Sequence, residues 1–257
     1  MDYGPNSTQY KHLISQSNRC RNLGMLFPVK KYLNHFSHLF YPHNCEACGT
    51  DILFDDQFLC ARCIHALPET NFFGTQNNPV EKLFFGRLNI THAGAAFYFT
   101  KDSMLQHLLV QLKYRSNKEA GYFLGRMMGY ALSKAERFNE VDALVALPLN
   151  PKKEYIRGYN QAILICEGIS EVWKRPVCRD AVTRIRFTET QTQQNRVSRW
   201  QNMEGVFAVT RPEALFNKHI LLVDDVITTG ATLEACGTVL LQVPGVSLSI
   251  GAAAYTI

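Results

Sequence analysis

Two adjacent carboxylates, Asp224 and Asp225, stand between an apolar run and a short polar loop. The preceding residues 220–223 read ILLV, which is typical of a strand covered on both faces. Carboxylates can accept hydrogen bonds from sugar hydroxyls, and the free N–H groups at a helix N-terminus can bind a phosphate. Because open α/β sheets bind ligands at the carboxyl ends of their strands, this run predicts a site for a ribose 5-phosphate.

The polar loop after the two aspartates contains residue types that suit a phosphate. Thr228 and Thr229 are expected to cap the next helix and to donate to phosphate oxygens, and Gly230 to let the backbone approach closely. That helix should run from residue 231 to about 242, followed by a turn and a strand. The alternative is a plain strand–loop–helix in which the two aspartates cap the helix and face solvent.

Four cysteines near the N-terminus form the pattern C-x2-C-x11-C-x2-C, namely Cys45, Cys48, Cys60 and Cys63. Each pair can turn two thiolates toward one tetrahedral metal, so we expect a closed, structural Zn²⁺ site. The alternatives are two disulfides or four unrelated thiols, and disulfides are disfavoured in the cytoplasm. Cys166, Cys178 and Cys236 lie in apolar contexts and are expected to be buried.

The composition is that of an ordinary soluble globular protein, with 46% hydrophobic and 19% charged residues in 257. The net charge of +5 permits a polyanionic partner without requiring one. No secretory signal is evident, so a cytoplasmic location is expected. The uncharged stretch 235–257 is long enough to span a bilayer, but its Pro-Gly pair and alternating pattern favour a helix end, a turn and a strand.

We expect three segments. Residues 1–24 are polar without periodicity, so they are predicted to be disordered or to be an over-long start, with translation beginning at Met25 instead. Residues 25–70 are predicted to form a helix and the four-cysteine module. Residues 88–257 should form an α/β domain with a parallel sheet flanked by helices. Its expected elements are one or two strands in 88–100, helices at 104–114 and 121–138, a strand at 141–147 and a helix at 160–173.

Two further segments are rich in cations. A loop with Lys152, Lys153 and Arg157 follows the strand at 141–147, where it would suit a pyrophosphate. The polar stretch 183–205 is expected either to close over a reactive sugar or to hold single-stranded nucleic acid, with Trp200 or Phe187 stacking on bases. An ordinary solvated loop is the third option. The cations expected to contact nucleic acid are Lys113, Arg115, Arg184, Arg186, Arg196 and Arg199.

Taken in order, the four-cysteine module and four later segments resemble the ComF family of competence proteins, also called the ComFC or GntX type. The four segments read LKYRS (112–116), LPLNPKKEYIRGYNQA (147–162), TQTQQNRVSRWQNMEGVF (190–207) and ILLVDDVITTGATLEAC (220–236). The last also resembles the PRPP-binding signature of type I phosphoribosyltransferases. Ser116 stands where relatives often have glycine. The family spacing places an arginine four residues after Gln194, and Arg199 lies one residue beyond that position. The resemblance implies a type I phosphoribosyltransferase fold with an N-terminal zinc module.

The resemblance also implies roles for individual residues. Asp224 and Asp225 would hold the ribose hydroxyls, directly or through Mg²⁺. The 5-phosphate would be bound by Thr228, Thr229, Gly230, Ala231 and Thr232. The pyrophosphate loop would contain Pro148, Lys152, Arg157 and Gly158.

Three functions are compatible with these observations. The resemblance implies a cytoplasmic role in single-stranded DNA uptake during natural transformation, beside a helicase-like competence protein. The alternatives are a PRPP-dependent phosphoribosyltransferase of nucleotide metabolism and a non-catalytic DNA-binding factor on the same fold. No segment is recognisable as the part of a phosphoribosyltransferase that binds the acceptor base, known as the hood. Enzymatic activity is therefore left open.

Overall fold

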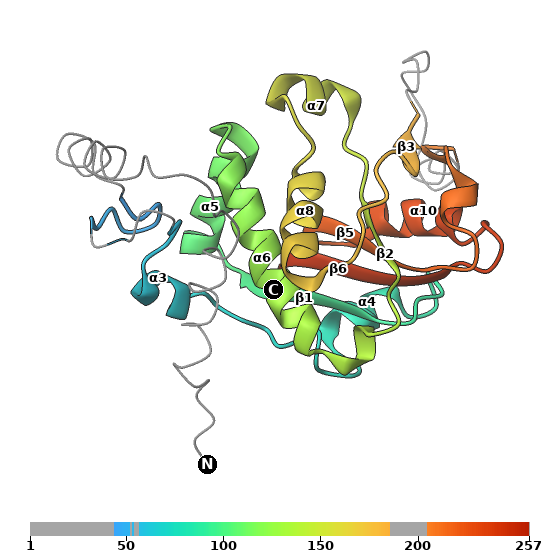
Figure 1. Cartoon of the computed structure of the whole chain (residues 1–257), viewed down its shortest axis with the longest axis horizontal. Coiled ribbons are helices and arrows are strands. Elements are labelled where there is room, and N and C mark those ends of the chain that lie inside the picture. Colours follow the sequence, from blue (N-terminus) through green and yellow to red (C-terminus); the bar gives the residue numbers. More distant parts are fainter. Residues whose placement is uncertain (1–43, 52, 54–56, 186–204, 257) are drawn as a thin grey trace, which may run out of the picture. The chain divides into compact units, whose positions relative to one another are not determined.

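The computed structural model describes residues 44–51, 53, 57–185 and 205–256. Some of the predictions concern residues outside these ranges, namely residues 1–24, residues 25–43, Arg186, Arg196 and Arg199. The described elements, shown in Figure 1, are α3 (Ala61–His65), α4 (Pro79–Phe84), β1 (Ala93–Phe99), α5 (Met104–Tyr114), α6 (Lys118–Lys134), η2 (Glu136–Phe138), β2 (Ala143–Ala146), α7 (Pro151–Arg157), α8 (Gln161–Trp173), β3 (Val182–Arg184), β4 (Phe207–Val209), η3 (Pro212–Ala214), β5 (His219–Ile227), α10 (Ala231–Leu240) and β6 (Ser247–Thr256).

A four-stranded parallel sheet with the order β1-β6-β5-β2 forms the centre of the α/β domain. The two inner strands, β5 and β6, are buried along most of their length, which explains their nearly continuous apolar sequence. β3 and β4, which stand on either side of residues 186–204 in the sequence, form a separate antiparallel pair. The predicted class, α/β with a parallel sheet flanked by helices and a small four-cysteine module before it, is confirmed.

The strand connections run in two directions across the sheet. From β2 the chain passes through α8 to Val177, which pairs with Leu144 on the outer side of β2. From β5 it passes through α10 to β6, on the other side. Because crossovers between parallel strands are right-handed, α8 and α10 must lie on opposite faces of the sheet. Neighbouring strands β2 and β5 therefore send their connections to opposite faces.

Helices α6 and α8 pack closely together over one face (Figure 1). Two glycines make this approach possible, since a Cβ atom on Gly125 would lie 2.2 Å from the carbonyl oxygen of Ile165, and one on Gly168 would lie 2.4 Å from that of Tyr122. On the other face α10 packs beside the segment after α4, where a Cβ atom on Gly237 would lie 2.7 Å from the Leu88 side chain. The sheet is thus covered on both sides, as a parallel sheet requires.

The predicted elements agree with the structure in most places and differ in two that concern the site. Strand β5 continues to Ile227, so the two aspartates lie within the strand and not after its end. Residues 151–157, predicted as a loop, form helix α7. Its start is stabilised because Pro151 occupies the first turn and the Asn150 side chain accepts from the Lys152 N–H, and Gly158 ends it with φ 78°.

The uncharged stretch 235–257 forms the end of α10, a turn and β6, as predicted. Among the described residues, none of the helices has the length and apolar character needed to cross a bilayer. Ser116 adopts φ 54°, in the left-handed region that favours glycine, so the serine is placed where a glycine would be less strained.

Candidate functional site

The carboxyl ends of β2 and β5 adjoin at the edge of the sheet where the connections diverge. The Leu147 N–H donates to the Val223 carbonyl at 2.8 Å, directly before Asp224. The Asn160 side chain, which also caps α8, donates to the Leu147 carbonyl at 3.0 Å. In open α/β sheets such a topological switch point forms the crevice that binds a ligand. The acidic pair, the start of α8 and the loop after β5 therefore meet at the position where a ligand is expected.

The two aspartates are partly buried and adjacent to each other. The Asp225 carboxylate pairs with the Lys113 ammonium at 3.1 Å, and the Asp224 carboxylate accepts from the Asp225 N–H at 2.7 Å. Burial, together with the Asp225 carboxylate, raises the pKa of Asp224 to about 7, although that N–H and Lys113 act in the opposite direction. An added cation or sugar hydroxyls would favour the charged form of Asp224. Lys113, predicted to contact nucleic acid, thus lies at the acidic pair.

The loop after β5 leads into α10 without a side-chain cap. Thr228 and Thr229 are exposed, and the helix N-cap is Gly230, which has φ 71°. Of the two predicted threonine caps, Thr228 forms none, and the Thr229 hydroxyl accepts only a long hydrogen bond, 3.5 Å, from the Ala231 N–H. Among the described residues, the N–H groups of Thr232 and Leu233 in the first turn have no acceptor, which is the condition for binding an anion at a helix N-terminus.

Gly230 is constrained by its surroundings as well as by its conformation. A Cβ atom there would lie 2.9 Å from the Phe84 ring. We expect Gly230→Ala to destabilise the fold by about 2 kcal/mol, since the left-handed conformation alone costs an alanine about 1 kcal/mol and the ring contact adds to it. Gly158→Ala is the matched control, because Gly158 has φ 78° with open space around its Cα. Equal losses of stability in denaturant titrations of the two variants would contradict the role of the Phe84 contact.

The predicted pyrophosphate residues lie around α7 and the start of α8. Lys152 is exposed on α7 and Arg157 is half-buried. The Arg157 guanidinium donates to the Gln161 side-chain oxygen at 2.9 Å. The Gln161 amide nitrogen is buried and has no hydrogen-bond partner in the described part of the chain. A buried donor without an acceptor is costly, so Gln161 is a candidate ligand residue that the sequence analysis missed.

Pro148 and Arg184 line a cavity of about 150 Å³ between the end of β2 and β3. Cys178 lines the same cavity and is half-buried, so the prediction that it is buried is wrong, whereas Cys166 and Cys236 are buried as predicted. The thiol of Cys178 is more accessible because it follows the short bridge to β2 instead of lying in the sheet.

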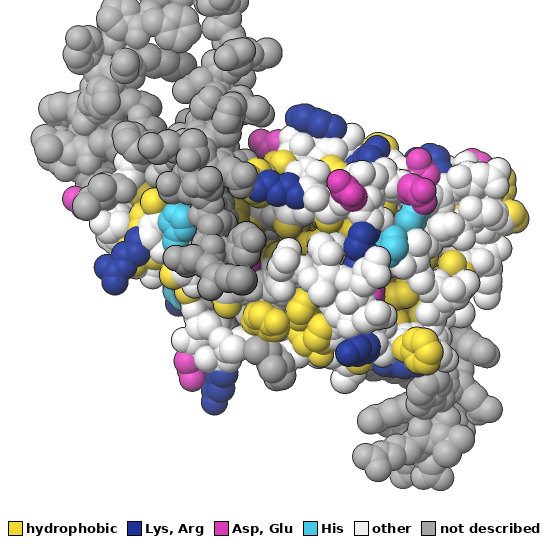
Figure 2. Space-filling model, turned by 90° about the horizontal axis from the view of Figure 1, so that it is seen from below, with side chains coloured by type: hydrophobic (Ala, Val, Ile, Leu, Met, Phe, Trp, Pro, Cys, Tyr) yellow, Lys and Arg dark blue, Asp and Glu magenta, His cyan; other side chains and the backbone are white. Residues whose placement is uncertain are grey.

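The remaining predicted nucleic-acid residues are dispersed in the described structure. Arg115 is exposed at the end of α5, and Arg184 stacks over the Phe207 ring at 5.5 Å. Over the face drawn in Figure 2, lysine and arginine side chains are scattered among acidic and hydrophobic ones and form no stripe. This face therefore offers no continuous positive surface to a polyanion.

Two exposed tyrosines that the sequence analysis missed lie near cations on α5 and α7. Tyr155 is 90% exposed, and Tyr114 is 73% exposed. The Arg157 guanidinium lies over the Tyr114 ring at 5.4 Å, which joins the two helix ends. Exposure of such large apolar side chains beside cations is characteristic of a binding surface. We call Arg115, Tyr114, Lys153 and Tyr155 the α5–α7 surface.

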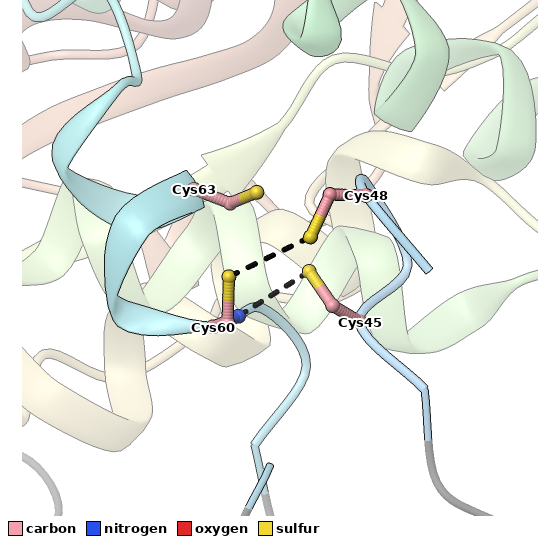
Figure 3. Close-up of side chains that lie close together, drawn as sticks. All are labelled: Cys45, Cys48, Cys60 and Cys63. Atoms are coloured by element: carbon pink, nitrogen blue, oxygen red, sulfur yellow. Dashed lines mark hydrogen bonds between the residues drawn. The ribbon is translucent and has the colours of Figure 1, made fainter. Parts of the chain in front are cut away.

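The four cysteines predicted to bind metal converge on one point (Figure 3). Their sulfur atoms all lie within 4.8 Å of one another, and those of Cys48 and Cys60 are 3.7 Å apart. These thiols are not joined in disulfides. Burial raises the pKa of Cys45, but N–H groups of Cys60, Cys48 and Ala47 outweigh it and lower the pKa to about 6. The cluster could hold a metal ion such as zinc.

The module packs on the α/β domain. The Phe58 ring contacts that of Phe123 on α6, with centroids 5.2 Å apart. The Gln111 side chain donates to the Glu46 carbonyl at 3.3 Å. The module thus supplements its small core with apolar surface of α6.

Comparison with known proteins gives three informative relatives. DNA utilization protein YhgH of Escherichia coli (strain K12) is 31% identical over 54% of this chain and 61% of its own length. Competence protein F of Haemophilus influenzae is 32% identical over 51% of this chain and 58% of its own length. Competence protein ComFC of Bacillus subtilis is 28% identical over 56% of each chain. The matches to these relatives thus leave about two fifths of their length uncovered.

Among solved structures, this chain is similar to a glutamine PRPP amidotransferase from B. subtilis complexed with ADP and GMP. The superposition has a TM-score of 0.39 and 19% sequence identity, and it covers 55% of this chain and 30% of the amidotransferase chain. That likeness is too distant to carry a conclusion about this chain. No family model matches. The sequence relatives nevertheless confirm the resemblance drawn from the motifs: the chain is a homologue of proteins named competence protein F, ComFC and DNA utilization protein YhgH.

Proposed function

We propose that the chain binds PRPP or a related phosphoribosyl ligand in the crevice between β5 and β2. The observation that carries this proposal is the meeting of the acidic pair with an uncapped helix N-terminus at a topological switch point. Carboxylates suit the ribose hydroxyls, and the first-turn N–H groups of α10 suit the 5-phosphate. The plain strand–loop–helix alternative gives no reason for a partly buried carboxylate whose pKa is raised to about 7.

The proposed roles follow from where the residues lie. Asp224 and Asp225 hold the ribose hydroxyls, directly or through Mg²⁺, for which carboxylate oxygens are suitable ligands. Residues 228–232 bind the 5-phosphate. Arg157 and Gln161 contact the pyrophosphate, whose oxygens would satisfy the unpaired Gln161 amide. When bound, Mg²⁺ would neutralise the pyrophosphate charge.

If the chain transfers the phosphoribosyl group, its residues would act by position and charge. No nucleophilic side chain is required, because an oxocarbenium-like transition state is stabilised by the fixed carboxylates and donors around it. The acceptor is not indicated by the described residues. Binding of the phosphoribosyl ligand is therefore the proposed function, and transfer is its extension.

We further propose that single-stranded DNA binds the α5–α7 surface, in keeping with a role in DNA uptake or use. The specific observations are the exposure of Tyr114, which precedes Arg115 at the end of α5, and of Tyr155, which lies on α7 together with Lys153. Unpaired bases can stack on such rings whatever their sequence, while cations contact the phosphates. Relatives are named for DNA utilization and competence. A helicase-like partner remains a prediction from the resemblance.

We expect Tyr114→Ala with Tyr155→Ala to weaken binding of a fluorescent oligothymidylate at least tenfold, since each base–aromatic stack contributes about 1–3 kcal/mol. Phe85→Ala is the matched control, because Phe85 is also 90% exposed but lies at the end of α4. Fluorescence anisotropy at several salt concentrations measures both affinity and its salt dependence. Affinity unchanged by the double substitution, or lost equally in the Phe85 variant, would reject this surface.

We propose Zn²⁺ as the metal of the four-cysteine cluster. In a tetrahedron with Zn–S bonds of about 2.3 Å, neighbouring sulfurs lie about 3.8 Å apart. The 3.7 Å separation of the Cys48 and Cys60 sulfurs agrees with this value. Four thiolates leave no open coordination position, so the proposed role of the metal is structural.

A further inference from the structure

Arg87 connects the segment after α4 to the loop that precedes α10. Its Nη1 atom donates to two carbonyl oxygens, that of Leu83 and that of Thr229, each at 3.1 Å. Its Nη2 atom forms an ion pair with the Glu234 carboxylate in the first turn of α10. One guanidinium therefore holds both the loop and the helix that the proposed phosphate site uses.

The Thr229 hydrogen bond determines where the next N–H group points. The described peptide bonds are trans, and in a trans peptide the carbonyl and the following N–H point in opposite directions. With the Thr229 carbonyl held toward Arg87, the Gly230 N–H is directed away from Arg87. No group among the described residues accepts a hydrogen bond from it. Phe84 packs against Gly230 and limits rotation of this peptide group.

We propose that Arg87 is a positioning residue for phosphate binding. By fixing the Thr229 carbonyl it orients the Gly230 N–H, and by pairing with Glu234 it sets α10 against the loop. Arg87 itself does not contact the phosphate. The proposal rests on the proposed phosphoribosyl site and adds the residue that pre-organises its donors.

The test is the affinity of variants for two probes, ribose 5-phosphate and magnesium pyrophosphate, measured by calorimetry. Methionine at position 87 keeps an unbranched side chain and removes all donors. We expect Arg87→Met to weaken ribose 5-phosphate binding at least tenfold and to change pyrophosphate binding less than twofold, because Arg87 lies beside the loop after β5 and not beside α7. Arg87→Lys, which keeps one donor group, should recover part of the loss.

Lys82→Met is the charge-matched control, since Lys82 is an exposed cation on the same segment and should leave both affinities unchanged. Unchanged ribose 5-phosphate binding in Arg87→Met would overturn the proposal alone. Equal weakening for both probes would also overturn it, by assigning Arg87 a general structural role. If the unmodified protein binds neither ribose 5-phosphate nor PRPP, the proposed function fails and this inference fails with it.

Discussion

Replacing Asp224 by asparagine is expected to raise the melting temperature of the free protein and to abolish its response to PRPP with Mg²⁺. Asparagine retains an oxygen that can accept from the Asp225 N–H, but it removes a carboxylate held beside another. The raised pKa of Asp224, about 7, means that the charged form is disfavoured in the fold. Gain of stability with loss of binding is the signature of a residue retained for a ligand.

The gain should depend on pH, with a sign that the raised pKa determines. The folded pKa exceeds the ordinary value of about 3.9, so between these pH values the folded state binds more protons than the unfolded chain. The protonated Asp224 carboxyl does not oppose folding, so the free energy of unfolding is highest, as far as this group is concerned, below about pH 4. It falls as the pH rises through about 7, where the carboxyl must ionise inside the fold. Asp224→Asn should therefore stabilise the protein most at pH 8, by at most about 4 kcal/mol, and little near pH 4.

Denaturant titrations at pH 5 and pH 8 measure this difference. Asp142→Asn is the control, because Asp142 is an exposed carboxylate at the opposite edge of the sheet, where it accepts from the His219 N–H. We expect no gain of stability from it at either pH. A loss of stability in Asp224→Asn at pH 8 would contradict the cost assigned to the acidic pair.

Removal of the metal is expected to unfold the four-cysteine module. Structural zinc sites contribute on the order of 10 kcal/mol of binding free energy, which a segment with so small a core does not replace. Cys45→Ser should abolish metal retention, and a strong chelator should have the same effect on the unmodified chain. Because Phe58 of the module packs on Phe123 of α6, the melting temperature of the remaining domain should fall as well.

Metal content by mass spectrometry and limited proteolysis of the segment before α4 measure these effects. Cys178→Ser is the matched control, since this half-buried thiol lies outside the cluster. It should retain one metal ion per chain and resist proteolysis. Zinc far below one per chain in the freshly purified, unmodified protein would refute the four-thiolate site.

The parts of the site formed by contiguous residues were predictable from the sequence. Residues 220–240 contain, in sequence order, a strand, the two aspartates, a glycine and a helix. Because these features are contiguous, the local pattern of residue types was enough to predict them. The convergence of the cysteines was predictable for a similar reason, because each C-x2-C pair is local and only one hairpin-length segment separates the two. Helix α5 matches its predicted bounds, and its start is fixed locally by Ser103, whose side chain accepts from the Gln106 N–H.

Features that depend on contacts between distant segments were not predictable. Lys113 was assigned to nucleic acid because its neighbours are basic, but the fold brings it to Asp225, more than a hundred residues later. Arg87 carried no signal, since its partner Thr229 belongs to another element. Helix α7 was taken for a loop because cations and flanking Pro and Gly obscured a helix of two turns.

The most direct test of the account is calorimetric titration of PRPP into the unmodified protein, with and without Mg²⁺, and into the variant carrying Asp224→Asn and Asp225→Asn. We expect the unmodified protein to bind PRPP saturably and to require Mg²⁺ for full affinity. The double variant should lose PRPP binding and still bind single-stranded DNA. Absence of PRPP binding by the unmodified protein, or equal binding by the double variant, would contradict the central claim that this crevice is a phosphoribosyl site.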